Sequence, residues 1–322
     1  MKTKFAIILL LLLGLCALRL ALGPSSVAYP SSSIIWRLRI NPILTATAVG
    51  IALAIAGVLM QALLRNPLAE PYILGIASGA GVGLMTQQFI AINLQTSLGA
   101  NYIGATLGAL ASIAILLLAS RKQGGINTLS LLLIGVVLST LNAAIIMVIQ
   151  YLIPRGLKAN LIDWMMGYLN QDNDLTTLIL TNLAFIAFTA YLTYTTAKAI
   201  DLITFSKTQA ASMGVNVGRV RLVLFLFAGL LTAAAVALAG PIGFVGFICP
   251  HIARKIFTSS HRVLLPASAI LGATLLVLAD TLSVYTKILA GQYHHPIGQM
   301  PIGIFTALIG GPVFIYIIKK QF

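Results

Sequence analysis

Runs of eighteen or more apolar residues recur from one end of this 322-residue chain to the other, separated by short segments with charges, prolines or glycines. A helix that crosses a bilayer needs about 20 mostly apolar residues, which leaves room for about ten such helices and short connections. Only 8% of the residues are charged, whereas a soluble domain carries about 25%. The sequence predicts an all-α, polytopic membrane protein, with residues 1–322 as one transmembrane domain, and excludes a soluble globular enzyme.

Ten spans are predicted where apolar stretches are cut by charges or by Pro and Gly clusters. They lie near residues 5–22, 40–64, 73–93, 100–119, 128–152, 175–197, 221–245, 248–259, 265–289 and 298–318. The eighth is too short to cross a bilayer unaided. The first imitates a signal peptide, but Leu15 before Cys16 is too large for lipoprotein cleavage, so we interpret it as an uncleaved helix.

The basic residues follow the positive-inside rule if both termini are cytoplasmic. Fourteen Lys and Arg residues then lie inside: Lys2, Lys4, Arg65, Arg121, Lys122, Lys198, Lys207, Arg219, Arg221, Arg254, Lys255, Arg262, Lys319 and Lys320. Six lie outside: Arg19, Arg37, Arg39, Arg155, Lys158 and Lys287. This bias predicts a multi-pass protein of the inner (plasma) membrane and accounts for the net charge of +14 without nucleic acid.

A weak internal repeat relates ALAIAGVLMQALLRNP to AVALAGPIGFVGFICP at an offset of 183 residues. Gly57 then matches Gly240, and Pro67 matches Pro250. Because five helices separate the copies, they run in opposite directions, as in the inverted repeats of transporters. Glycines at every fourth position of the third and fourth spans predict close helix packing; they are Gly75, Gly79, Gly83, Gly104 and Gly108.

The energy source is constrained by what the sequence lacks. Asp280 is the one charge that we place inside a span, which argues against an ion-coupled secondary transporter, and no filter motif indicates a channel. No GxxxxGK[ST] loop is present, so an ATPase that drives transport must be another polypeptide. In the longest inner connection, small residues before Gly214 predict a short helix that fits a groove on a partner; an ordinary solvated loop is the alternative.

Motifs spread over nearly the whole chain resemble those of the FecCD family, the permease subunits of ABC importers for siderophores, haem and cobalamin, and are similar to the cobalamin importer's membrane subunit. They are GVLMQALLRNPLAEPYILGIASGAGVG, WMMG, GFVGFICPHIARKI, HRVLLP, LAD and PIGIFTALIGGPVF. The signature residues are Gln61, Asn66, Pro67, Pro71, Gly75, Gly79, Pro250, His251, Asp280, Pro301 and Gly303.

This resemblance implies a transport subunit that is not itself an enzyme and needs no cofactor. It implies a homodimer with a central path, two cytoplasmic ATPase subunits, and a periplasmic or lipid-anchored binding protein. The implied function is ATP-driven import of an iron–siderophore chelate by alternating access, with cobalamin or haem as the alternative cargo. The residues themselves do not identify the chelate or show that both permease subunits are identical.

The resemblance also implies roles for individual residues. The ATPase-coupling element contains Lys207, where the cobalamin permease has a glutamate, with Ala210, Ala211 and Gly214. The cytoplasmic gate falls on Thr128 and Leu129. Binding-protein docking falls on Arg37, Arg39 and Lys287, since Pro42 and Val284 stand at two positions where the family has arginines.

A cluster of possible metal ligands precedes the last span. It comprises His294, His295, Gln299 and Met300, where Gln299 and Met300 stand in place of the family's glutamate. Adjacent histidines on a loop are poorly placed to hold one ion, so we interpret this segment as an ordinary loop and predict no metal site, with metal binding as the alternative.

Overall fold

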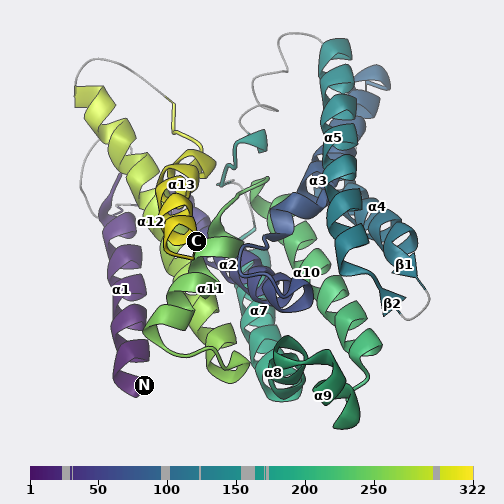
Figure 1. Ribbon diagram of the computed structural model, residues 1–322. Helices are drawn as coiled ribbons and strands as arrows, with labels where there is room; N and C mark the ends of the chain where they lie inside the picture. Colours follow the sequence, from purple (N-terminus) through teal and green to yellow (C-terminus); the bar gives the residue numbers. More distant parts are fainter. Residues whose placement is uncertain are drawn as a thin grey trace.

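The computed structural model describes residues 1–23, 30, 32–95, 102–122, 125–153, 164–169, 171, 174–292 and 298–321, and this part of the chain is almost entirely helical (Figure 1). The helices are α1 (Lys2–Ala21), α2 (Ser33–Leu64), η1 (Pro71–Leu74), α3 (Ile76–Asn93), α4 (Tyr102–Ser120), α5 (Thr128–Leu152), α7 (Leu175–Thr195), α8 (Ala197–Phe205), α9 (Lys207–Ser212), α10 (Val217–Ala239), α11 (Val245–Ile256), α12 (His261–Gln292) and α13 (Ile302–Gln321). Two short antiparallel strands, β1 (Arg121–Lys122) and β2 (Gly125–Ile126), join α4 to α5. The all-α prediction is confirmed.

The ten predicted spans correspond in order to α1, α2, α3 with η1, α4, α5, α7, α10, α11, α12 and α13. Seven helices in the described residues are long and apolar enough to cross a membrane, namely α1, α2, α4, α5, α7, α10 and α12. Helix α11 has 12 residues and is about 18 Å long, which is less than the roughly 30 Å of a hydrocarbon core. This confirms the prediction that the eighth span is too short to cross a bilayer unaided.

Two contacts show which helix ends lie together. Lys4 Nζ donates to the carbonyl of Ile256, 2.6 Å away, and joins the start of α1 to the end of α11. Arg65 Nε donates to the carbonyl of Ile203, 2.7 Å away, and joins the end of α2 to α8. Figure 1 shows the N-terminus at the same end of the bundle as α8 and α9. We call this the inner end and the opposite one the outer end.

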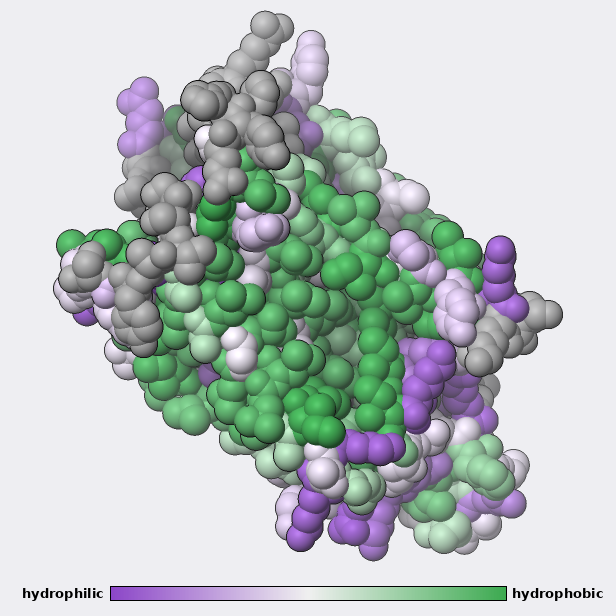
Figure 2. Space-filling model, turned by 90° about the vertical axis from the view of Figure 1, so that its left-hand side faces the viewer, coloured by the Kyte–Doolittle hydropathy of each residue, from purple (hydrophilic) through white to green (hydrophobic). Residues whose placement is uncertain are grey.

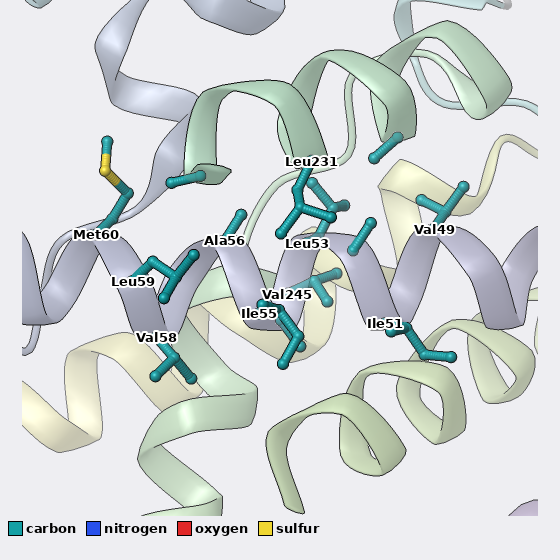
Figure 3. Packing of buried hydrophobic residues seen from close by; sticks show 14 of the residues in the cluster. Val49, Ile51, Leu53, Ile55, Ala56, Val58, Leu59, Met60, Leu231 and Val245 are labelled. Atoms are coloured by element: carbon teal, nitrogen blue, oxygen red, sulfur yellow. The ribbon is translucent and has the colours of Figure 1, made fainter. Parts of the chain in front are cut away.

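Helix α2 is the centre of the bundle and α1 is its edge. In α2, 89% of the most apolar 18-residue window of the helix is buried; in α1, only 11% of the corresponding window is buried. Figure 3 shows side chains of α2 pointing in several directions toward the neighbouring helices. Leu231 of α10 and Val245 of α11 belong to the same buried cluster. Figure 2 shows the face on the α1 side as a broad hydrophobic surface with hydrophilic residues along its lower edge. An apolar face of this kind suits lipid.

Helices α3 and α4 cross at glycines, as the sequence predicts. A Cβ atom on Gly83 would lie 2.0 Å from the carbonyl oxygen of Gly104, and one on Gly108 would lie 2.1 Å from that of Gly79. Gly75 has a different role, because it is not in a helix. It joins η1 to α3 with φ of +78°, a conformation that side chains with a Cβ rarely adopt.

The span predicted at 221–245 ends early, at Ala239. Gly240 has φ of +71° and turns the chain away from the axis of α10, and the chain then re-enters a helix at Val245. The two copies of the predicted repeat therefore differ in structure, since the first stays helical as far as Leu64 and ends in the turn after α2, whereas the second is interrupted by this break after Ala239. They pack against each other where a Cβ on Gly57 would lie 1.9 Å from the carbonyl oxygen of Gly246.

Candidate translocation and coupling sites

The buried signature residue Gln61 joins α2 to α11 near the inner end. Gln61 Nε2 donates to the carbonyl of Gly246 at 3.3 Å, and Arg254 Nη1 donates to Gln61 Oε1 at 2.6 Å. Gln61 is 3% exposed. The side-chain amide of Gln61 thus bonds to a main-chain carbonyl with its nitrogen and to a guanidinium group with its oxygen. Inside a membrane, where water is absent, such groups need a partner within the protein.

The backbone break before α11 has a side-chain carboxyl group as its hydrogen-bond partner. Glu70, directly before η1, accepts a hydrogen bond from the main-chain nitrogen of Phe244, whose φ is +70°. The first N–H groups of a helix lack partners within it, so the Glu70 side chain satisfies a main-chain group that α11 leaves open. We name Gln61, Glu70, Phe244, Gly246 and Arg254 the inner cluster. Our sequence interpretation missed Glu70, although it is the acidic residue of the longest motif.

The remaining signature residues of this region shape the chain. Asn66 Oδ1 accepts from the main-chain nitrogen of Leu68 at 2.9 Å and so forms the turn after α2, next to exposed Pro67. Pro71 opens η1. Pro250 is buried inside α11, and the ring of His251 stacks on Phe247 with centroids 6.2 Å apart. Beside Glu70 lies a cavity of about 10 Å³, room for about one water molecule.

The predicted coupling segment contains the short helix that we expected. Ser206 Oγ caps α9 by accepting from the main-chain nitrogen of Gln209 at 3.3 Å. Gly214, with φ of +81°, ends it, because the nitrogen of Val215 donates to the carbonyl of Ala210 at 3.0 Å. Ala210 is buried, whereas Ala211 and Gly214 are exposed.

Lys207 is the first residue of α9. A short helix with small exposed residues is therefore present at the inner end, next to the exposed side chain of Met213. Its contact with an ATPase stays a prediction.

Helix α8, directly before α9, carries a carboxylate that contacts α12. Asp201 Oδ1 accepts from the main-chain nitrogen of His261 at 3.0 Å and lies 2.5 Å from its Nδ1, while Oδ2 accepts from Ser260 Oγ at 3.2 Å. Partial burial acts to raise the pKa of Asp201, but the hydrogen bonds from His261 and Ser260 together outweigh it and lower the pKa. The carboxylate is ionised at neutral pH.

The predicted gate residues lie at the inner end of α5. Thr128 is the first residue of α5, which Asn127 caps by accepting from the main-chain nitrogen of Ser130 at 3.1 Å. Leu129 is 67% exposed and begins an exposed apolar face that continues through Leu133. An apolar face of this kind can pack against a second copy of the chain or against lipid. The role of Thr128 and Leu129 as a gate stays a prediction.

The outer end holds a second buried polar group. Arg19 Nε donates to Asp280 Oδ2 at 2.5 Å, and both side chains are almost fully buried. Gln299 Nε2 donates to Asp280 Oδ1 at 3.3 Å, Gln171 Nε2 donates to Gln299 Oε1 at 3.4 Å, and Asn41 Nδ2 donates to the carbonyl of Gln171 at 2.8 Å. We name these five residues the outer network; it connects α1, α12 and α2 with the segments before α13 and α7.

Two sequence interpretations change here. We placed Arg19 among the charges outside the membrane and regarded Asp280 as the one charge inside a span. Arg19 is instead 3% exposed and pairs with Asp280. Asp280 therefore connects α12 with α1 and with the segment before α13.

Two further motifs meet beside this network. The main-chain nitrogen of Ile302 donates to the carbonyl of Gly167 at 2.9 Å, directly after Pro301. A Cβ on Gly303 would lie 2.2 Å from the carbonyl oxygen of Met166, and one on Gly240 would lie 2.1 Å from that of Trp164. The WMMG motif is thus packed between the end of α10 and the start of α13, and only glycine fits at both contacts.

The predicted docking residues differ in how far their side chains are exposed. Arg37 is exposed and Lys287 is half-buried. Arg39 is 8% exposed, and its Nη1 donates to the carbonyls of Leu20 at 2.7 Å and Ala21 at 3.3 Å. Helix α2 starts seven residues before its predicted span, and this brings Arg39 inside the bundle as a cap for α1.

Val284 is also buried, packed with Leu22 and Ile288, so this position stabilises the α1–α12 contact. The histidines at 294 and 295 lie outside the described residues. Among the residues that the structure describes, no group of three His, Cys, Asp or Glu side chains could hold a metal ion.

The long apolar helices, the broken helix with satisfied backbone groups and the buried ion pair define a polytopic membrane transport protein. Residues 6–320 match the FecCD transport family, and the chain belongs to this family. Its relatives are transport subunits of ABC importers and not enzymes, and this chain is one as well.

Three similar proteins illustrate the match. The hemin transport system permease protein of Yersinia pestis is 37% identical over 290 residues, which cover 89% of this chain and 84% of that protein. The vitamin B12 import system permease protein of Escherichia coli is 34% identical over 314 residues, which cover 97% and 92%. A solved inward-facing structure of a metal-chelate type ABC transporter is 30% identical and covers 97% of each chain, with a TM-score of 0.82.

Proposed function

We propose that this chain is the permease of an ATP-driven importer that passes an iron–siderophore chelate across the inner membrane by alternating access. One observation carries the proposal: the fold matches an inward-facing metal-chelate transporter along 97% of both chains. The chain acts as one transmembrane domain, together with a second copy of itself, two ATPase subunits and a binding protein.

Haem or cobalamin is the second candidate cargo. The relatives named for hemin and for vitamin B12 favour it, because each covers most of this chain. Uptake by cells that lack their own importers for all three cargoes separates the candidates. We expect ATP-dependent accumulation of a radio-iron hydroxamate chelate when the chain is expressed with its partners. Accumulation of hemin or cobalamin without the iron chelate would contradict the iron–siderophore proposal.

The bundle is proposed to sit with its inner end in the cytoplasm. This orientation is supported by the basic residues of α1, α8 and α11, which lie at the end that carries α9. A reporter fused after Phe322 should be cytoplasmic, and one inserted between residues 154 and 174 should be periplasmic. The opposite result at either site would contradict the orientation.

Helix α9 is the proposed ATPase contact. Gly214 is a poor position for the test, because its φ of +81° makes any side chain strained. Ala211 is exposed on α9, so Ala211→Trp adds bulk to the surface without disturbing the core. We expect the ATPase subunits to stop co-purifying with this variant. Thr195→Trp, on an exposed site at the inner end of α7, is the control and should bind them normally.

A further inference from the structure

Helix α12 receives its N-terminal cap from another helix. The helices α7 and α10 are capped by the residue directly before them, since Asp174 accepts from the nitrogen of Thr177 and Asn216 from that of Arg219, each at 2.9 Å. The first turn of α12 is bonded instead by Asp201 of α8. A local cap would stabilise α12 equally well, so the cap from α8 adds a mechanical connection between the two helices.

The same α8 is continuous with the proposed ATPase contact. Only Ser206 separates α8 from α9; its nitrogen donates to the carbonyl of Leu202 at 3.1 Å, and its side chain caps α9. Ala210 fixes the inward side of α9 in the main core cluster. The two short helices therefore form one unit, and Asp201 is its charged contact with α12.

The far part of α12 holds the segment that leads into α13. Asp280 follows His261 by 19 positions in an unbroken helix, which is about 28 Å. There Gln299 donates to Asp280, and Ser283 Oγ donates to the carbonyl of Met300. Helix α12 also packs closely on α2, because a Cβ on Gly272 would lie 2.1 Å from the carbonyl oxygen of Gly50. Helix α12, which contains Pro266 in its second turn, thus runs as one continuous helix from its contact with α8 to the start of α13.

We propose that Asp201 is a positioning residue that makes α12 move with the α8–α9 unit, so that a displacement of α9 reaches the segment before α13. This inference rests on the proposed ATPase contact at α9. Without the bonds to His261 and Ser260, the inner unit moves on its own and the outer end no longer follows it.

The test compares Asp201→Ala, His261→Ala and the double variant in the complete transporter. Two quantities are measured: uptake per ATP hydrolysed, with whichever of the three cargoes the wild type accumulates, and thiol labelling at Gly298→Cys before α13, with Cys16 replaced by Ala. We expect the ATPase subunits to bind and hydrolyse ATP, but uptake per ATP to fall about tenfold, within the usual range of coupling free energies. The ATP-dependent change in labelling should disappear.

A structural role alone would not produce the remaining expected results. The double variant should lose no more than Asp201→Ala, because both changes remove one interaction. Asp201→Asn keeps an oxygen that accepts from the nitrogen of His261, so its uptake per ATP should lie between those of the wild type and Asp201→Ala. The control is Asp174→Ala, which removes the carboxylate cap of α7 at the outer end and should leave uptake per ATP unchanged.

Three outcomes would overturn the inference. They are unchanged uptake per ATP in Asp201→Ala, additive losses in the double variant, and loss of ATPase binding in Asp201→Ala. Failure of the α9 proposal is seen separately, as normal ATPase binding by Ala211→Trp.

Discussion

The inner cluster and the outer network are both polar and buried or half-buried, but they satisfy different groups. In the inner cluster, Gln61 and Glu70 bond to main-chain groups of Gly246 and Phe244, at the place where a helix is broken. In the outer network, Arg19 and Asp280 bond to each other. Broken backbone inside a membrane needs fixed partners for its N–H and C=O groups, whereas two buried charges need each other and further hydrogen bonds, such as the one from Gln299 to Asp280. The inner cluster therefore shapes the chain, and the outer network ties complete helices together.

Among the changes proposed here, we expect the largest loss of stability from breaking the ion pair between Arg19 and Asp280. Arg19→Met leaves Asp280 as an uncompensated buried charge and should lower the free energy of unfolding by about 3–5 kcal/mol. Replacing both partners, Arg19→Met with Asp280→Leu, should recover most of that loss. Heat resistance of the detergent-solubilised protein, followed by size-exclusion chromatography, is the measurement. A double variant as unstable as the single one would mean that the outer network does more than pair two charges.

A smaller effect is expected at the inner contact. Gly57→Ala places a Cβ 1.9 Å from the carbonyl of Gly246, so α2 and α11 must separate, and overpacking of this kind costs about 1–3 kcal/mol. Gly311→Ala in α13 is the control, since nothing lies within 4 Å of its Cβ position. The same heat-resistance assay should show a loss for Gly57→Ala alone. Equal behaviour of the two variants would show that the close contact is not needed.

The smallest expected effect concerns docking at the outer end. Exposed charge pairs are worth about 0–1 kcal/mol and mainly set the rate of encounter. Arg37→Glu should slow association with the binding protein more than Arg37→Ala does, and the defect should shrink as salt rises. Arg39→Ala should instead reduce stability, because Arg39 caps α1. Association of Arg37→Glu that does not depend on salt would remove Arg37 from the docking surface.

The helices that the sequence predicts best are those with local end signals. Helix α5 has the predicted bounds, because Asn127 caps it just where the apolar run begins. The end of α10 was wrong, since the apolar run continues through Gly240 while the backbone turns there. The end of α2 at Leu64 agrees with the prediction, but its start does not, because the predicted span was cut after the charges of Arg37 and Arg39, whereas the helix begins at Ser33 and Arg39 is buried.

The site residues, like the helices, could be predicted where the signal is local and not where it depends on long-range contacts. Ala210, Ala211 and Gly214 could be recognised from a local pattern, and the structure has the short helix that this pattern predicts. No local pattern connects Arg19 with Asp280, which are 261 positions apart, or Glu70 with Phe244, 174 positions apart. Pairings of this kind depend on how the helices pack and could not be predicted from one sequence.

We infer that ATP drives transport through this chain and that the buried pair of Arg19 and Asp280 only holds helices together. The most direct test is uptake into proteoliposomes that contain the permease, its ATPase subunits and its binding protein, at constant ATP, with and without a protonophore and a sodium gradient. We expect uptake to be unchanged by either condition, both in the wild type and in the Asp280→Asn variant that remains folded. Uptake that collapses with the protonophore at constant ATP would contradict the claim and indicate an ion-coupled carrier.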